Sequence, residues 1–115
     1  DMNGDGIADV LWRDSSFTGS QIYAWMVNAS DPSDLTFSGD YLFNGTTELN
    51  GWEVSGLADM DGDELADILW RDPNNRMYVW KTRYDASNAS NPLTYVGDWL
   101  YTGTGLAGWS VENDD

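Results

Sequence analysis

The chain has 115 residues, and its 20 acidic side chains outnumber its 5 basic ones, which gives a formal net charge of -15. Hydrophobic residues make up 41% and aromatic residues 14% of the chain, enough for the core of one small domain and too much for a wholly disordered protein. The acidic charge excludes nucleic acid as a partner, and the absence of a long apolar run excludes insertion into a membrane.

The chain contains no histidine and no cysteine. Thiol nucleophiles, Ser-His-Asp relays, imidazole bases and the usual zinc ligands are therefore absent. Paired carboxylates are the remaining route to catalysis, as in glycosidases, but outside the acidic loops no pair stands in a recognisable setting. We therefore expect a protein that is not an enzyme, and a glycosidase would have to depend on Asp14 or Asp72.

The first predicted element is an acidic loop over residues 1–9. Side chains with oxygen atoms recur at every second position, and the backbone carbonyl of the seventh residue can complete the set. Calcium takes six to eight such oxygens, whereas magnesium demands stricter geometry, so the pattern predicts a calcium site. The predicted ligands are Asp1, Asn3, Asp5, Ile7 and Asp9. The alternative is a solvated turn, because Asp, Asn and Gly also favour turns for local backbone reasons.

Four short strands follow, each bounded by turn residues: 8–13, 21–27, 35–43 and 52–57. They are rich in aromatic and β-branched residues, and no segment shows a sustained helical period. The spacing predicts an antiparallel meander of four strands, which is the construction of a propeller blade.

The whole pattern then recurs. Residues 59–72 read DMDGDELADILWRD and match residues 1–14, and later segments stay in register. The sequence therefore predicts two repeats, 1–58 and 59–115, and an all-β fold of two tandem four-stranded antiparallel blades with calcium-binding loops. Residues 108–115 match residues 51–58, so we expect that a further unit could follow the second without a seam.

The second loop repeats the oxygen spacing, with a glutamate where the first loop has Gly6. Its predicted calcium ligands are Asp59, Asp61, Asp63, Leu65 and Asp67. Two ions would change the formal charge from -15 to -11. Glu64 stands where the backbone favours glycine, so the calcium affinity of this loop is left open.

The two loops and the Ala-Asp-(Val/Ile)-Leu-Trp-Arg runs that follow them resemble the FG-GAP/VCBS-type repeat of integrin α-chain propellers and secreted bacterial proteins. The resemblance covers both repeats. It implies a calcium-braced blade in an extracellular or cell-surface protein that adheres, scaffolds or binds sugar. Glu64 departs from the glycine of the family's loop.

Seven tryptophans are many for this length, and most have a counterpart in the other repeat. Trp12 matches Trp70, Trp25 matches Trp80, and Trp52 matches Trp109. We expect packing between adjacent sheets as their main use. The alternative is an exposed platform for sugars, formed by Trp25, Trp80, Trp99 and Tyr41.

Two further features recur or stand in predicted turns. Arg13-Asp14 and Arg71-Asp72 occupy equivalent places, and we expect a structural ion pair or a turn anchor rather than an anion site. Asn28, Asn44 and Asn88 begin Asn-x-Ser/Thr triplets and are candidate glycosylation sites.

A blade buries its faces only against neighbouring blades, and two blades do not close a ring. We therefore expect a non-catalytic extracellular structural or adhesive module that associates with itself or with neighbouring repeats, as a ring, a filament or part of a longer array, with glycans or surface proteins as further partners. The alternatives are a carbohydrate-binding lectin and an accessory domain of a glycoside hydrolase or lyase.

Overall fold

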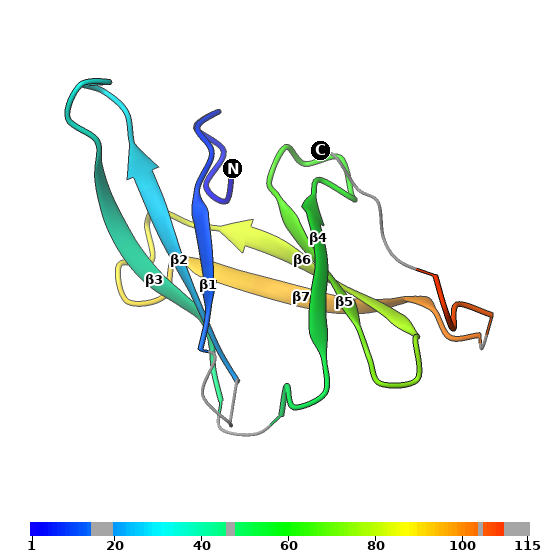
Figure 1. Cartoon of the computed structure of the whole chain (residues 1–115). Helices are drawn as coiled ribbons and strands as arrows, with labels where there is room; N and C mark the ends of the chain where they lie inside the picture. Colours follow the sequence, from blue (N-terminus) through cyan, green and yellow to red (C-terminus); the bar gives the residue numbers. More distant parts are fainter. Residues whose placement is uncertain (15–19, 46–47, 104, 110–115) are drawn as a thin grey trace.

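The computed structural model describes residues 1–14, 20–45, 48–103 and 105–109. Within them the chain is all-β, with two antiparallel sheets and no helix (Figure 1). The first sheet has the order β1-β2-β3, and the second has the order β4-β5-β6-β7. The strands are β1 (Val10–Arg13), β2 (Gln21–Asn28), β3 (Thr36–Asn44), β4 (Glu53–Ala58), β5 (Asp67–Arg71), β6 (Met77–Tyr84) and β7 (Leu93–Tyr101).

The all-β prediction is confirmed, and the four strands predicted for the first repeat begin and end within two residues of those observed. Among the residues described, no helix is long and apolar enough to cross a lipid bilayer.

The prediction of two four-stranded units is wrong for the first sheet, which has three strands. The predicted fourth strand, β4, pairs instead with β5, so that Val54 lies opposite Trp70. Strands β4 and β5 follow each other along the chain and are joined by the short second acidic loop, and such neighbours usually pair. The described sheets also form no closed propeller.

The repeat division at residues 58 and 59 stays a prediction. In the structure this point lies between the paired strands β4 and β5, inside the second sheet. The repeat that the sequence defines is therefore offset by one strand from the sheet that the backbone forms. The boundary between the two sheets falls between the third and fourth strands of the first sequence repeat, at the turn before β4.

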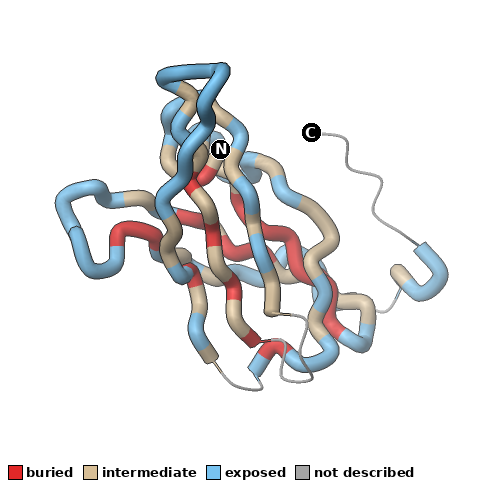
Figure 2. Tube along the Cα trace, turned by 60° about the vertical axis from the view of Figure 1, so that its left-hand side comes forward, coloured by how far each residue is buried: buried red, intermediate tan, exposed pale blue. Residues whose placement is uncertain are grey.

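The main core lies between the two sheets. On β2, Ile22, Ala24 and Met26 are buried and alternate with less buried neighbours, as expected for a strand with one covered face. They share a hydrophobic cluster with Trp70 and Trp80 of the second sheet. Figure 2 shows the buried segments concentrated in the middle of the molecule, where the sheets face each other.

The two recurring arginines anchor turns. Arg13 donates to the backbone carbonyls of Trp52 (2.5 Å) and Leu49 (2.7 Å), and Arg71 donates to the equivalent carbonyls of Trp109 and Leu106. Arg13 thus fixes the turn that leads from the first sheet to β4, and Arg71 fixes the equivalent turn 106–109 after β7. The predicted turn anchor is confirmed.

Candidate metal centres

The first acidic loop is organised by its own carboxylates. Asp1 accepts hydrogen bonds from the backbone N–H groups of Gly4 (2.7 Å) and Gly6 (2.9 Å), and Asp5 accepts one from Ile7 (2.8 Å). These bonds wind the loop around the side chains at its odd positions. The arrangement follows from the alternation of short oxygen-bearing side chains with glycine, because Asp binds backbone two or more residues ahead and glycine permits the tight turn.

The second loop repeats these bonds. Asp59 accepts from the N–H groups of Gly62 (2.8 Å) and Glu64 (2.8 Å), and Asp63 accepts from Leu65 (3.0 Å). Carboxylate oxygens of four residues all lie within 4.8 Å of one another; the four are Asp59, Asp61, Asp63 and Asp67. Hard oxygen donors at this spacing fit the ligand set that calcium takes. Sequence spacing predicted all four.

The last aspartate of each loop connects the loop to its sheet. Asp67 is fully buried and accepts from the N–H groups of Met60 (2.8 Å) and Thr82 (2.9 Å). In the first loop, Asp9 accepts from Met2 (2.6 Å) and Val27 (2.9 Å). In each loop one carboxylate therefore binds both the start of the loop and an inner strand of the sheet, β2 for Asp9 and β6 for Asp67.

The two loops lie against each other. The N–H of Ala66 donates to the carbonyl oxygen of Asp1 (2.7 Å), and a cleft of about 400 Å³ between the loops is lined by Asp1, Asp9, Asp59 and Glu64 among others. The sequence repeat predicts two loops but not their adjacency, which arises because the sheets pack face to face.

Glu64 adopts the backbone conformation of the glycine that it replaces. Its φ is 70°, close to the 81° of Gly6 in the first loop. A residue with a Cβ is strained in this left-handed region by about 1–2 kcal/mol. The second loop therefore keeps the geometry of the first and stores strain at Glu64.

We expect Glu64→Gly to raise the free energy of unfolding by about 0.5–1 kcal/mol, because relief of the strain exceeds the added entropy of the unfolded chain. Gly6→Ala is the matched control and should cost about 1 kcal/mol, since a Cβ at Gly6 meets no atom within 4 Å and only the backbone is strained. Urea denaturation with calcium chelated measures both. A loss of stability in Glu64→Gly would show that the left-handed backbone is not a source of strain.

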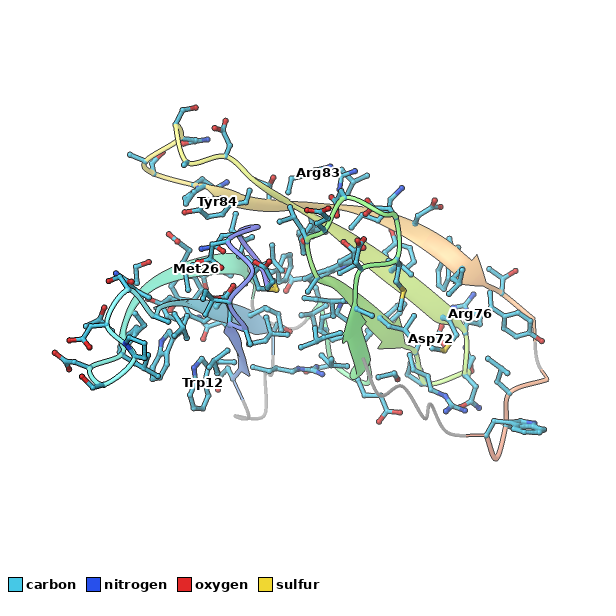
Figure 3. The ribbon with its side chains drawn as sticks, turned by 90° about the horizontal axis from the view of Figure 1, so that it is seen from above. Trp12, Met26, Asp72, Arg76, Arg83 and Tyr84 are labelled. Carbon is cyan, nitrogen blue, oxygen red and sulfur yellow. The ribbon has the colours of Figure 1, made fainter. Side chains whose placement is uncertain are left out.

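The side chain of an arginine on β6 reaches the second loop. Arg83 donates from Nη1 to Asp61 (3.1 Å) and Asp63 (3.3 Å), and Figure 3 shows it beside the loop. Desolvation raises the pKa of Asp61. Hydrogen bonds with Asp63 and Arg83 and the arginine charge together lower it by more, so the pKa lies below its usual value. Desolvation and repulsion by Asp61 and Asp67 raise the pKa of Asp63 despite a hydrogen bond from Leu65. One guanidinium thus offsets only part of the repulsion among four carboxylates.

Sequence reasoning missed Arg83. The repeat itself contains the signal, because Arg83 at the end of β6 stands where the first repeat has Asn28 at the end of β2. Only the second loop has a basic side chain at this position. The two loops therefore differ in charge compensation as well as in the number of carboxylates, since Asn3 replaces one of the four carboxylates in the first loop.

We expect Arg83→Gln to strengthen calcium binding by the second loop by about tenfold, since the ion then need not displace a cation from Asp61 and Asp63. Asn28→Arg is the reciprocal change and should weaken binding by the first loop by a similar factor. Isothermal titration calorimetry of both variants measures these affinities. Equal affinities in the parent chain and Arg83→Gln would mean that the arginine does not compete with the ion.

The four residues predicted as a sugar platform do not share one surface. Trp25 and Tyr41 lie on the outer side of the first sheet, whereas Trp80 is buried between the sheets. Trp80 and Trp99 line a cleft of about 470 Å³ with Tyr78 and Trp52. Seven of the nine residues that line this cleft are aromatic, namely six tryptophan or tyrosine residues and Phe43; its single acidic member is Glu48.

The expectation that the matched tryptophans pack between sheets is confirmed for Trp70 and Trp80, which are buried. It is wrong for Trp12 and Trp109, which are exposed. The equivalent positions differ because the second sheet is covered on this side by the first sheet, and the first sheet is not covered in the same way.

Asn28, Asn44 and Asn88 are exposed at strand ends and in the turn after β6. Their glycosylation stays a prediction. Thr46, which completes the second triplet, lies outside the described residues, as do residues 110–115 of the predicted repeat junction.

Asp72 has a structural partner. It forms an ion pair with Arg76 (2.6 Å) and accepts the backbone N–H groups of Asn74 and Arg76 (Figure 3). Desolvation raises its pKa, but these hydrogen bonds and the arginine charge lower the pKa below its usual value. An ionised carboxylate that holds a turn is a poor candidate for a catalytic acid.

Residues 1–70 match the family model described as an FG-GAP-like repeat. The match includes both acidic loops and ends on β5. Comparisons with curated proteins and with solved structures gave no match.

Proposed function

Because this chain belongs to the FG-GAP-like repeat family, we propose that it is a non-catalytic structural or adhesive repeat module of an extracellular protein, braced by calcium in its two acidic loops. The observation that carries the proposal is the group of four carboxylates within 4.8 Å in the second loop. Their mutual repulsion is only partly relieved by Arg83, and a divalent cation would relieve it more fully.

Calcium fits this donor set better than magnesium does. Flexible coordination by six to eight oxygens suits a loop that offers several carboxylates and a backbone carbonyl, whereas magnesium requires near-octahedral geometry and retains water. The predicted carbonyl ligands are those of Ile7 and Leu65. The family resemblance implies an extracellular location, and extracellular modules typically bind calcium with a modest Kd of about 0.1–1 mM.

The expected consequence of binding is a more rigid sheet. Asp67 is both a predicted ligand and the acceptor for the N–H groups of Met60 and Thr82, so an ion held by Asp67 is coupled to the loop and to β6. Asp9 couples the first loop to β2 in the same way through Val27. Calcium would thus stabilise the orientation of each loop relative to its sheet.

Thermal unfolding of the chain in 1 mM calcium, 1 mM magnesium or EDTA tests the proposal. For a Kd of about 0.1 mM, 1 mM calcium adds about 1.4 kcal/mol per site, or about 6 °C in Tm for a chain of this size. The double variant Asp61→Asn/Asp63→Asn should lose most of the calcium effect of its loop while keeping similar side-chain volume. An identical Tm in calcium and EDTA would overturn the proposal.

Carbohydrate binding is the second candidate, favoured by the aromatic cleft between the sheets. Tryptophan and tyrosine rings stack on sugar rings, and Glu48 would accept hydrogen bonds from hydroxyl groups. Trp99→Ala should then abolish binding in a glycan array without lowering Tm in parallel. A parent chain that binds no glycan on the array would count against this candidate.

A further inference from the structure

The contact between the two sheets joins unlike faces. The first sheet contributes its aliphatic face, defined as Leu11, Ile22, Ala24, Met26 and Leu42. The second contributes its aromatic face, defined as Trp70, Tyr78, Trp80, Tyr95 and Trp99, and all but Trp99 belong to or pack against the shared core cluster. Such a contact between different surfaces is heterologous. Each sheet also has a second face, which points away from this contact.

The outer face of the first sheet reproduces the aromatic face of the second. We call it the first aromatic face: Trp12, Tyr23, Trp25, Phe37 and Tyr41. The Trp12–Trp25 centroids are 4.9 Å apart at 62°, and those of Trp70–Trp80 are 5.0 Å apart at 58°. Trp25–Phe37 stacks at 4.1 Å and Trp80–Tyr95 at 3.9 Å; Tyr23–Tyr41 and Tyr78–Trp99 meet edge to face at 4.6 and 4.8 Å.

Burial distinguishes these two arrays. Trp70 is 1% exposed because the first sheet covers it, whereas Trp12 is 47% exposed, and Phe37 is exposed as well. In Figure 3 Trp12 projects from the side of the first sheet opposite to Met26. An ordered aromatic array of this kind on a surface is typical of an interaction site.

The outer face of the second sheet repeats most of the aliphatic face of the first, but Lys81 stands where the first sheet has Met26 and forms an ion pair with Asp98 (3.7 Å). We call this outer face the second aliphatic face: Leu69, Met77, Val79 and Leu100, with Met60 at its margin. Leu100 is 62% exposed, whereas its counterpart Leu42 is 7% exposed in the core, and Met60 is 38% exposed against 2% for Met2. Leu69, Met77 and Val79 are only 6–7% exposed and have Leu106 packed against them, so the face is open at Leu100 and Met60.

Trp109 lies in a turn that repeats the turn of Trp52. In the turn 106–109 the backbone N–H of Trp109 donates to the carbonyl oxygen of Leu106 (3.0 Å). In the turn 49–52 the backbone N–H of Trp52 donates to the carbonyl oxygen of Leu49 (3.0 Å), and the φ angles of Gly108 and Gly51 are 84° and 83°. Trp52 packs on the second sheet, with ring centroids 6.0 Å from Tyr78 and 5.9 Å from Trp99. Trp109 is 69% exposed.

We propose that the second aliphatic face of one copy of this chain, together with its Trp109, packs against the first aromatic face of a second copy. The two faces correspond to the two halves of the contact already formed inside the chain. Their exposed parts, Leu100 and Trp109 on one and Trp12 and Phe37 on the other, are left for a second copy to cover. The proposal deepens the function proposed above, because it names the partner and the surfaces of the structural module. Repetition of this heterologous contact builds a ring or a filament according to the rotation per copy.

Sedimentation velocity from about 1 to 500 µM tests the proposal on the full chain, with two variants that each block one face. Phe37→Lys carries a charge on the first aromatic face, and Leu100→Lys carries one on the second aliphatic face. Both side chains are exposed, so far-UV circular dichroism should match the parent, and Tm should fall by only a few degrees even where the Phe37–Trp25 stack is lost. Ala89→Lys, in the turn after β6, is the control with the same charge change.

We expect the parent and Ala89→Lys to increase in mass with concentration, and each face variant alone to remain monomeric. An equimolar mixture of Phe37→Lys and Leu100→Lys should form a 1:1 dimer and nothing larger, because one intact pair of faces remains. Trp109→Ala should weaken association of the parent at least tenfold.

A monomeric parent at 500 µM, a mixture that stays monomeric, or a Leu100→Lys chain that dimerises with itself through its aromatic face would each overturn the proposal. Repetition of the series in EDTA separates it from the calcium proposal, because neither blocked residue is a predicted ligand. Calcium binding by a monomeric chain would refute the assembly alone. Assembly of a chain that binds no calcium would refute the bracing alone.

Discussion

Asp67→Ala is expected to lower the free energy of unfolding by about 2–5 kcal/mol, even with calcium chelated. Asp67 is fully buried, and its carboxylate accepts the N–H groups of Met60 and Thr82. Alanine leaves both donors without this acceptor. An unsatisfied buried group costs about 1–3 kcal/mol, which applies in full to the buried N–H of Thr82 and in part to the partly buried N–H of Met60. Urea denaturation in EDTA measures the loss without any contribution from metal binding.

Asp9→Ala is the matched change in the first loop. Asp9 accepts two equivalent hydrogen bonds but is only partly buried, so water can replace the carboxylate and the cost should be smaller. Asp67→Asn keeps an acceptor oxygen and should fall between alanine and the parent chain. Equal losses for Asp67→Ala and Asp9→Ala would show that burial of the carboxylate does not set its contribution.

Arg13→Met is expected to cost about 2–4 kcal/mol. The guanidinium donates to the carbonyls of Leu49 and Trp52 and lies 5.3 Å from the Trp70 ring, and hydrogen bonds from a charged donor contribute about 1.5–3 kcal/mol. Burial lowers the pKa of Arg13, but a guanidinium stays charged at any physiological pH. Methionine keeps the length of the aliphatic stem and removes the donors.

Arg13→Lys separates charge from geometry. Lysine keeps the positive charge but cannot present the planar fork that reaches two carbonyls, so it should recover less than half of the loss. Chemical denaturation of the three chains under identical conditions provides the comparison. Full recovery by lysine would mean that charge alone, and not the paired hydrogen bonds, fixes the turn before β4.

The sequence determined the local features of this protein because they depend on short-range chemistry. The alternating oxygens of residues 1–9 and 59–67 fold each loop around its first aspartate, and turn residues bound every strand. The repeat predicted that the two copies would have equivalent turns, and the structure shows this in the arginine anchors of Arg13 and Arg71. Even the departure at Glu64 was visible, although its backbone angle was not.

Other features depend on what lies beside a residue and not on the residue itself. Trp12 and Trp70 stand in the same sequence context, yet one is exposed and the other buried, because only the second sheet has a neighbour on its aromatic face. The pairing of β4 with β5 and the approach of Arg83 to Asp61 and Asp63 likewise join residues whose partners are set by the path of the backbone. Repeated segments of similar propensity thus have different burial in the folded protein. Tertiary packing decides which faces are covered, because most of the free energy of burial is gained there.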